Sequence, residues 1–473
     1  MTVGQVIVAG LVVAAGAATA AAQGPRRIDR PAGPAMAHAD AFLEALTSGD
    51  AGRFEAMAKE HFTPELYGRR TAEERGQMVA RVRADFGALT VTSLDRRAGG
   101  PLTLDVRGTT GLEGRIELTF EPPPLERIAR VGIEVGEAGS RNDGPPPEVH
   151  AGMSAADLAR GLDAWLEPLA ASGRFSGVVL VAKAGQAVYE EAFGLSDRGR
   201  GLANTAATRF NLGSINKIFT KTAIAQLVAA GRLKRSDTLG ALLPEYPDAD
   251  TRAATVDQLL DHQAGVADFF GPAFDAADKT TFRSNADYYR HVSSQPALFP
   301  PGTRRQYCNG CYIVLGAVIE RVSGQRYEDY IAQHVYARAG MTGAQPTGAG
   351  AATGYTRRGV DGERAGPPRS NAPMLGAAGS AAGGGFATAR DLLAFDIAMR
   401  AGRLADPVQT AWLLHVARVT PGRSDGSIGI AGGAPGINAI VESSRDWTVV
   451  VLANLDPPAA ERVGVDIHRR LAR

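Results

Sequence analysis

The chain has 473 residues, enough for two or three domains that each bury a core of their own. Its 44% hydrophobic and 21% charged residues are ordinary for a soluble globular protein and exclude wholesale disorder. The formal charge of +1, from 51 basic and 50 acidic residues, provides no electrostatic footprint for nucleic acid or an anionic membrane. We therefore expect a small-molecule or peptide partner and no nucleic acid.

The first 22 residues form an apolar, Ala- and Gly-rich segment without Lys or Arg. An apolar run starts at Val6, and the small residues before Gln23 fit the A-x-A pattern of a secretory cleavage site. Residues 1–22 are therefore predicted to be a signal peptide, with an uncleaved anchor as the alternative. The mature chain is predicted to be periplasmic or secreted, without a membrane span.

Residues 37–135 are predicted to form a small α+β domain. Apolar residues first recur at helical spacing, as in Phe42 and Leu46, and later follow strand-like patterns in residues 102–106, 115–120 and 127–135. Helices followed by a meander resemble the cone-shaped nuclear-transport-factor-like fold, and no active site is predicted there. Residues 136–152 are rich in Gly, Pro and charge and are predicted to be a linker.

Residues 153–473 are predicted to form a second, larger domain. Two apolar runs at 177–182 and 187–193, joined around Gly185, predict a hairpin, and runs at 437–441 and 447–452 predict another before a last helix. Strands at both ends with helices between them indicate one antiparallel sheet assembled from the two ends of the domain. The expected fold class is thus α/β, of the α+β kind.

One segment of this domain has the pattern of a nucleophile. In residues 211–228, NLGSINKIFTKTAIAQLV, Ser214 opens an apolar helix and Lys217 lies three residues later on the same face. A serine hydroxyl needs an adjacent base, and the positive end of a helix favours the anion that forms. On its own, the four-residue pattern is more often an N-cap serine with a surface lysine.

A second segment about ninety residues later supports the catalytic interpretation. Tyr307-Cys308-Asn309 lies between a Pro-Gly turn and another apolar helix. Together with LLDHQAGV at 259–266, GGGFATARDL at 383–392 and GGAPG at 432–436, the chain resembles the serine β-lactamase and penicillin-recognising hydrolase family, in its class C, D,D-peptidase and esterase branch. The resemblance covers about residues 153–473 and implies a β-lactamase-like sheet flanked by helices.

The resemblance also implies roles for individual residues. Ser214 would be the acylated nucleophile, Lys217 a general base or electrostatic activator, and Tyr307 the proton shuttle to the leaving group. Asn309 would hold a substrate amide, and the backbone N–H groups of Ser214 and Gly433 would form the oxyanion hole. No cofactor and no metal are expected, and the substrate would be a small ester, amide or peptide.

One departure from the family pattern bears on the substrate. The family places a Lys or His where this chain has Ile430, in Ile430-Ala431-Gly432. That cation pairs with a substrate carboxylate, so its loss is expected to disfavour acidic substrates and to spare neutral esters. Esterase-type or broad acyl and peptide hydrolysis is therefore the leading prediction. The alternative is a catalytically weak or inactive penicillin-binding-like protein.

Three further residues have structural interpretations. His262 is expected to be a packed structural histidine, since a single histidine gives no metal site. Cys308 and Cys311 form C-x-x-C at a helix start, and we expect them to be small packing residues. The alternative is a local disulfide, which would persist in an exported protein and stiffen the loop of Tyr307.

Overall fold

The computed structural model describes residues 33–68, 71–96, 101–110, 113–136, 147–358, 364–417 and 427–472. The chain divides into two compact units, Met1–Val135 and Gly136–Arg473. The predicted signal peptide and most of the predicted linker lie outside the described residues. Within the described part of the chain, every helix is too short or too polar to cross a membrane.

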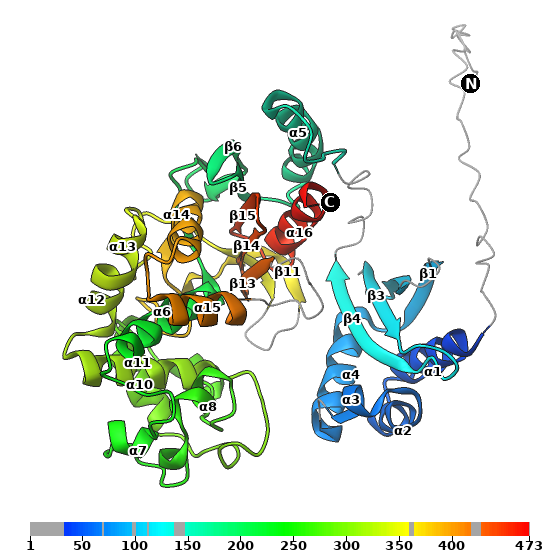
Figure 1. Cartoon of the computed structure of the whole chain (residues 1–473). Helices are drawn as coiled ribbons and strands as arrows, with labels where there is room; N and C mark the ends of the chain where they lie inside the picture. Colours follow the sequence, from blue (N-terminus) through cyan, green and yellow to red (C-terminus); the bar gives the residue numbers. More distant parts are fainter. Residues whose placement is uncertain are drawn as a thin grey trace, which may run out of the picture. The chain divides into compact units, whose positions relative to one another are not determined.

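The first unit places helices before strands, in blue to cyan in Figure 1. The helices are α1 (Pro34–Ser48), α2 (Ala51–His61), α3 (Pro64–Gly68) and α4 (Ala72–Phe86), and the sheet has the order β1 (Leu89–Arg96), β2 (Leu102–Gly108), β3 (Glu113–Phe120) and β4 (Ile128–Gly136). Phe42 of α1, Phe54 of α2 and Leu104 of β2 are fully buried in one apolar cluster. The likeness to the nuclear-transport-factor-like fold stays a prediction.

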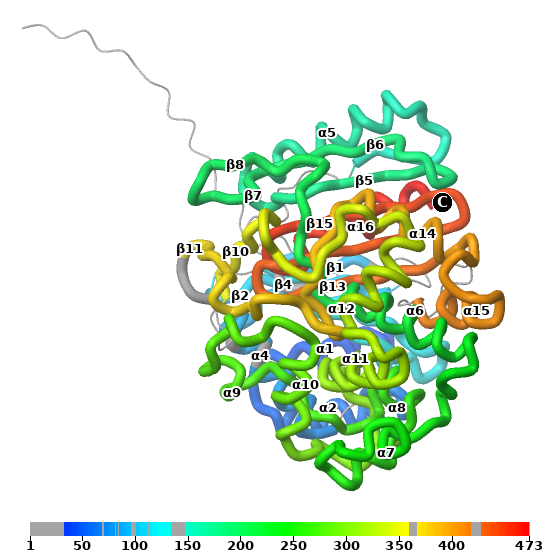
Figure 2. Tube along the Cα trace, turned by 90° about the vertical axis from the view of Figure 1, so that its left-hand side faces the viewer, coloured from blue at the N-terminus to red at the C-terminus, as the bar shows by residue number. Residues whose placement is uncertain are grey.

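The second unit is built on a five-stranded antiparallel sheet from both ends of the unit, as predicted. Its order is β13 (Ile428–Ala434), β14 (Ile437–Ser443), β15 (Trp447–Ala453), β5 (Gly177–Lys183) and β6 (Gln186–Phe193). The central pairing joins β15 to β5, with Val450 opposite Leu180, and Figure 2 shows β5 beside β6. β13 lies at one edge of the sheet.

Helices cover both faces of this sheet, so its central strands are apolar on both faces. Residues such as Val179 and Val449 face α5 (Ala155–Ala171) and α16 (Ala459–Leu471) on one side. Leu180 and Val450 share the larger core with α6 (Asn216–Ala229), α14 (Ala389–Arg400) and α15 (Pro407–Val416) on the other. A capping box of Thr388 and Asp391 begins α14.

The remaining elements lie between β6 and β13 in the chain. They are β7 (Leu195–Asp197), β8 (Leu202–Ala203), β9 (Phe210–Asn211), η1 (Gly213–Ile215), α7 (Leu239–Leu242), η2 (Thr251–Ala253), α8 (Val256–Leu260), α9 (Pro272–Ala276), η3 (Lys279–Thr281), α10 (Asn285–Ser293), α11 (Asn309–Ser323), α12 (Tyr327–Ile331), the π-helical turn η4 (Ala332–Tyr336), α13 (Ala337–Ala339), β10 (Tyr355–Arg358), β11 (Arg364–Ser370), η5 (Ala372–Met374) and β12 (Phe386–Ala387). β12 pairs with β9, and α11 packs against α6. This packing brings the starts of α6 and α11 together.

Candidate active site

Ser214 lies in the short turn η1 that joins β9 to α6. Gly213, directly before it, has a φ of 49°, a left-handed conformation that glycine adopts without steric cost. The Asn211 side chain fixes the turn, because its Oδ1 accepts the Gly213 N–H at 2.9 Å. Ser214 is therefore presented on a constrained turn directly before α6, at the place where the sequence predicts that a helix begins.

Lys217 is buried beside Ser214 on the first turn of α6, with 6% of its surface exposed. Its Nζ lies 3.2 Å from Ser214 Oγ and 2.8 Å from Asn309 Oδ1. A third contact, at 2.5 Å, is with the backbone oxygen of Ala382. A neutral amine has two hydrogens and one lone pair. The two carbonyl oxygens can take both hydrogens, which leaves the lone pair for the Ser214 hydroxyl.

The surroundings of Lys217 favour this neutral form. Burial lowers the pKa of Lys217 from 10.5 to about 7, Asp268 partly opposes the fall, and Lys221 adds to it. At pH 7 about half of the Lys217 side chains are then neutral, against roughly 0.04% for a lysine with an ordinary pKa. Lys217 can thus accept a proton at neutral pH.

Tyr307, in the loop before α11, completes the contacts of the serine. Its hydroxyl lies 2.6 Å from Ser214 Oγ, although 56% of the residue is exposed. Burial of the hydroxyl raises the pKa of Tyr307, the hydrogen bond with Ser214 opposes the rise, and Asp268 adds to it. Tyr307 therefore stays protonated at neutral pH and can donate a hydrogen bond to Ser214.

His262 packs against the Tyr307 loop and is 8% exposed. Its ring stacks on that of Tyr307 at 4.9 Å between centroids, and its Nδ1 accepts the Cys308 N–H at 3.1 Å. Burial, with the charges of Lys217, Lys221 and Arg305, lowers the pKa of His262 to about 3. A neutral His262 is a positioning residue for Tyr307, in line with the structural role expected from the sequence.

The expectation that Cys308 and Cys311 only fill space is wrong, because the two form a disulfide with a Cα–Cα distance of 5.3 Å. Cys308 caps α11 and Cys311 lies on its first turn, so a three-residue spacing brings the two side chains to one side of the helix start. The bridge encloses Asn309 and directly follows Tyr307.

Asn309 connects the lysine to a carboxylate that sequence reasoning missed. Its Oδ1 contacts Lys217, and its Nδ2 donates to Asp268 Oδ2 at 2.9 Å. Asp268 also accepts the Phe270 N–H at 3.1 Å. Asp268 lies two residues after the 259–266 segment, and that position was the only signal in the sequence that could have pointed to it. The predicted amide-binding residue is thus engaged inside the protein.

The edge strand β13 passes close to the nucleophile turn and contacts η1. A Cβ on Gly432 would lie 2.1 Å from Leu212 O and 2.8 Å from Ser214 N, so the approach requires glycine there. The backbone nitrogen of Gly433 faces the same turn, 3.0 Å from where a Gly213 Cβ would be. The structure therefore brings together Ser214, Lys217, Tyr307, Asn309 and the Gly433 backbone.

Ile430, two residues before Gly432 on β13, is 9% exposed and belongs to the larger apolar core. Its place in the strand is the one where the sequence comparison expects a cation. Of the segment before β13, residues 418–426 lie outside the described residues.

Comparisons with known proteins identify the family of the second unit. The β-lactamase family model matches residues 162–473. The putative penicillin-binding protein PbpX of Bacillus subtilis (strain 168) is 33% identical over 171 residues, which cover 36% of this chain and 41% of that protein. Esterase EstB of Burkholderia gladioli is 32% identical over 187 residues, covering 37% and 47%. The chain thus spans less than half the length of these curated relatives.

A solved structure, the penicillin binding protein from Bacillus halodurans, superposes with a TM-score of 0.55 at 27% identity. The superposition covers 64% of this chain and 99% of the Bacillus halodurans chain. The residues matched by the family model include the whole range from η1 to β13, which contains the candidate site. The chain belongs to the β-lactamase family.

Proposed function

We propose that this protein is a serine hydrolase that forms an acyl-enzyme on Ser214. The observation that carries the proposal is the position of Ser214 Oγ, which lies 3.2 Å from Lys217 Nζ and 2.6 Å from the Tyr307 hydroxyl. One neighbour has a lowered pKa and the other a raised pKa. A base and an acid on the same oxygen are what acyl transfer needs.

The pKa directions support Lys217 as the group that accepts the first proton. Neutral Lys217 accepts the Ser214 proton as Oγ attacks the substrate carbonyl carbon. The N–H groups of Ser214 and Gly433 stabilise the resulting oxyanion, a contribution typically worth a few kcal/mol of barrier. Tyr307 then protonates the leaving group as its bond to carbon breaks, and the Lys217 ammonium returns the proton to Tyr307.

Deacylation repeats these steps with water in place of the serine. The base removes a proton from water, the hydroxide attacks the acyl carbon, and Ser214 leaves with the proton returned to its Oγ. The overall reaction consumes one water and yields an acid and an alcohol or amine. The chain's own residues handle each proton.

We propose neutral esters, with broad acyl or peptide hydrolysis beside them, as the substrate class. Ile430 offers an apolar side chain where a cation would meet a substrate carboxylate, so a charged substrate loses a charge-assisted contact. The similarity to an esterase supports this class. The second candidate, a penicillin-binding-like protein with weak or no turnover, is favoured by the same Ile430 and by the similarity to penicillin-binding proteins.

Labelling with two probes separates the candidates. The intact protein is incubated with a neutral fluorophosphonate and, separately, with a penicillin, and adducts are located by peptide mass spectrometry. We expect a fluorophosphonate adduct on Ser214, a weaker penicillin adduct, and neither in Ser214→Ala. A protein that forms no adduct with either probe would be the binding protein, and an adduct elsewhere would move the nucleophile.

Export to the periplasm or to the exterior is part of the proposal. The Cys308–Cys311 disulfide supports it, because such bonds persist in oxidising compartments and are rare in the cytosol. Residues 1–22 have the composition of a signal peptide. Alkylation of the protein, purified under non-reducing conditions from cells expressing the full chain, would detect both cysteines if the bond does not form.

A further inference from the structure

A cavity separate from the Ser214 contacts opens beside β9. Its volume is about 350 Å³, within the range of roughly 300–1,000 Å³ that small-molecule sites span. The walls come from β9, the loop at 347–354, the segment 371–377, β12, the start of β14 and the end of β15 with the residue that follows it. Ser214, Lys217 and Tyr307 are absent from its described lining.

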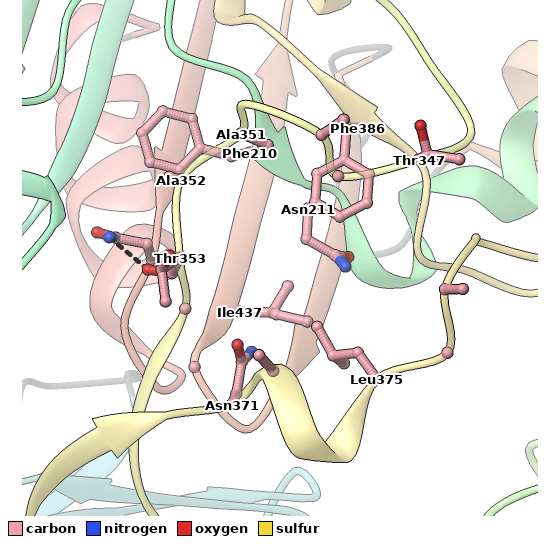
Figure 3. Close-up of a pocket in the computed structure, with 18 of the residues that line it drawn as sticks. Phe210, Asn211, Thr347, Ala351, Ala352, Thr353, Asn371, Leu375, Phe386 and Ile437 are labelled. Atoms are coloured by element: carbon pink, nitrogen blue, oxygen red, sulfur yellow. Dashed lines mark hydrogen bonds between the residues drawn. The ribbon is translucent and has the colours of Figure 1, made fainter. Parts of the chain in front are cut away.

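The described lining is apolar except for a few amide and hydroxyl groups, which are uncharged. Phe210, Leu375, Phe386 and Ile437 provide the large apolar surfaces, with alanines and glycines between them. Figure 3 shows these side chains around one space. Among the described residues that line it, none is acidic or basic. A charged ligand would lose its hydration without gaining a partner.

The described lining contains three asparagines. Asn211 from β9 and Asn371 from the start of η5 point into the space (Figure 3), whereas Asn454 donates its Nδ2 to the backbone oxygens of Leu195 and Thr353. Asn211 Oδ1 accepts the Gly213 N–H, so its Nδ2 is offered to the cavity as a donor. Asn371 is 2% exposed, and its Nδ2 donates to Pro435 O at 2.8 Å. These partners fix both amide orientations, which otherwise have to be inferred.

Asn371 therefore presents its Oδ1 as an acceptor, to which no group in the described chain donates. This oxygen therefore needs a ligand or water as its hydrogen-bond donor. A donor from Asn211 and an acceptor from Asn371 match the C=O and N–H of one amide group. The apolar walls match a neutral substituent on that amide.

We propose that this cavity binds a neutral ligand that carries an amide group and an apolar side group. The ligand's C=O accepts from Asn211 Nδ2, and its N–H donates to Asn371 Oδ1. Because Asn211 also holds the turn before Ser214, the site adjoins the nucleophile without sharing its contacts. The inference concerns binding and does not require the chain to be a hydrolase.

The test compares two probes of nearly equal shape, N-acetylphenylalaninamide and N-acetylphenylalanine. Binding is measured by calorimetry and ligand-observed NMR on the full chain carrying Ser214→Ala, which prevents turnover. The amide is expected to bind roughly tenfold or more tightly than the acid, because both probes carry an N-acetyl amide but only the acid brings a carboxylate charge, for which the described lining offers no cationic partner. Equal affinities, or no binding of the amide, would overturn the proposal.

Two variants place the binding in this cavity. Leu375→Trp fills the cavity and should abolish binding of the amide, whereas Val408→Trp, at a residue 73% exposed on α15, should leave it unchanged. Asn371→Leu should weaken binding of the amide about tenfold, because it removes the acceptor for the ligand's N–H. Amide binding that survives Leu375→Trp would assign the probe to another site, even if Asn371→Leu fails to fold.

Discussion

Replacing Asp268 by Asn should move the acidic limb of the pH–rate profile to lower pH. Asp268 is the group that holds the pKa of Lys217 up against burial, which lowers it to about 7. Removing the carboxylate charge should lower that pKa by roughly 1 unit more. Asparagine keeps one carbonyl oxygen for the Asn309 Nδ2, so the contact at 2.9 Å can survive.

The size of the effect depends on pH. With a pKa of about 7, roughly 9% of the Lys217 side chains are neutral at pH 6, and with a pKa near 6 about half are. The acylation rate at pH 6 should therefore rise about fivefold relative to its plateau. At pH 8 both proteins have more than about 90% neutral Lys217, so the profiles converge. A less basic amine lowers the plateau, which makes the midpoint the diagnostic quantity.

The assay is kcat/KM for a neutral nitrophenyl ester from pH 5 to pH 9 at constant ionic strength. The matched control, Asp275→Asn, removes the same charge from an exposed position on α9 and should leave the midpoint near 7. An ester-active Asp268→Asn protein whose midpoint is unchanged, or lies at higher pH, would show that Lys217 is not the titrating base.

Three further predictions test the site. Ser214→Ala should abolish hydrolysis and change the free energy of unfolding, measured in urea, by only about 1 kcal/mol, because it removes two side-chain hydrogen bonds of the partly exposed serine. Lys217→Met should stabilise the fold increasingly as pH falls from 9 to 7, by about 2 kcal/mol over that interval. The reason is that, in the wild type, the unfolded chain binds a proton that folded Lys217, with a pKa of about 7, has largely lost. A stability difference that does not depend on pH would contradict the lowered pKa. Ile430→Lys, with Ile430→Met as the neutral control, should raise kcat/KM for a carboxylate-bearing β-lactam relative to a nitrophenyl ester by roughly tenfold to a hundredfold. An unchanged ratio in a folded variant would show that the missing cation does not set specificity.

The sheet of the second unit could be predicted because its signals are local. The strands β14 and β15 are mostly apolar runs joined by a short polar turn, and the predicted last helix, α16, follows them. Elements such as β9 and β12 have two residues each and are defined by their pairing with each other. A pairing across about 175 residues leaves no periodicity in either segment. In the first unit, β1 and α4 were missed for lack of a strong apolar pattern.

In the candidate site, too, the sequence predicts the contacts between neighbouring residues and not those between distant segments. The spacing of Ser214 and Lys217 places both on one helix turn, so local reasoning was enough for this pair. The third partner of Lys217 is the backbone oxygen of Ala382, and a carbonyl has no sequence signal. Asp268 acts on Lys217 across Asn309, which lies 41 residues further along the chain, so only the folded structure reveals the connection.

The segment between α8 and α9 links the two proton-handling residues of the proposed mechanism. His262 stacks on Tyr307 and accepts the Cys308 N–H, so it fixes the acid. Asp268, six residues later, bonds Asn309 and raises the pKa of Lys217, so it adjusts the base. The Cys308–Cys311 disulfide closes the turn that both contacts hold. Changes in this one segment should therefore alter both limbs of the pH–rate profile, although none of its side chains contacts Ser214.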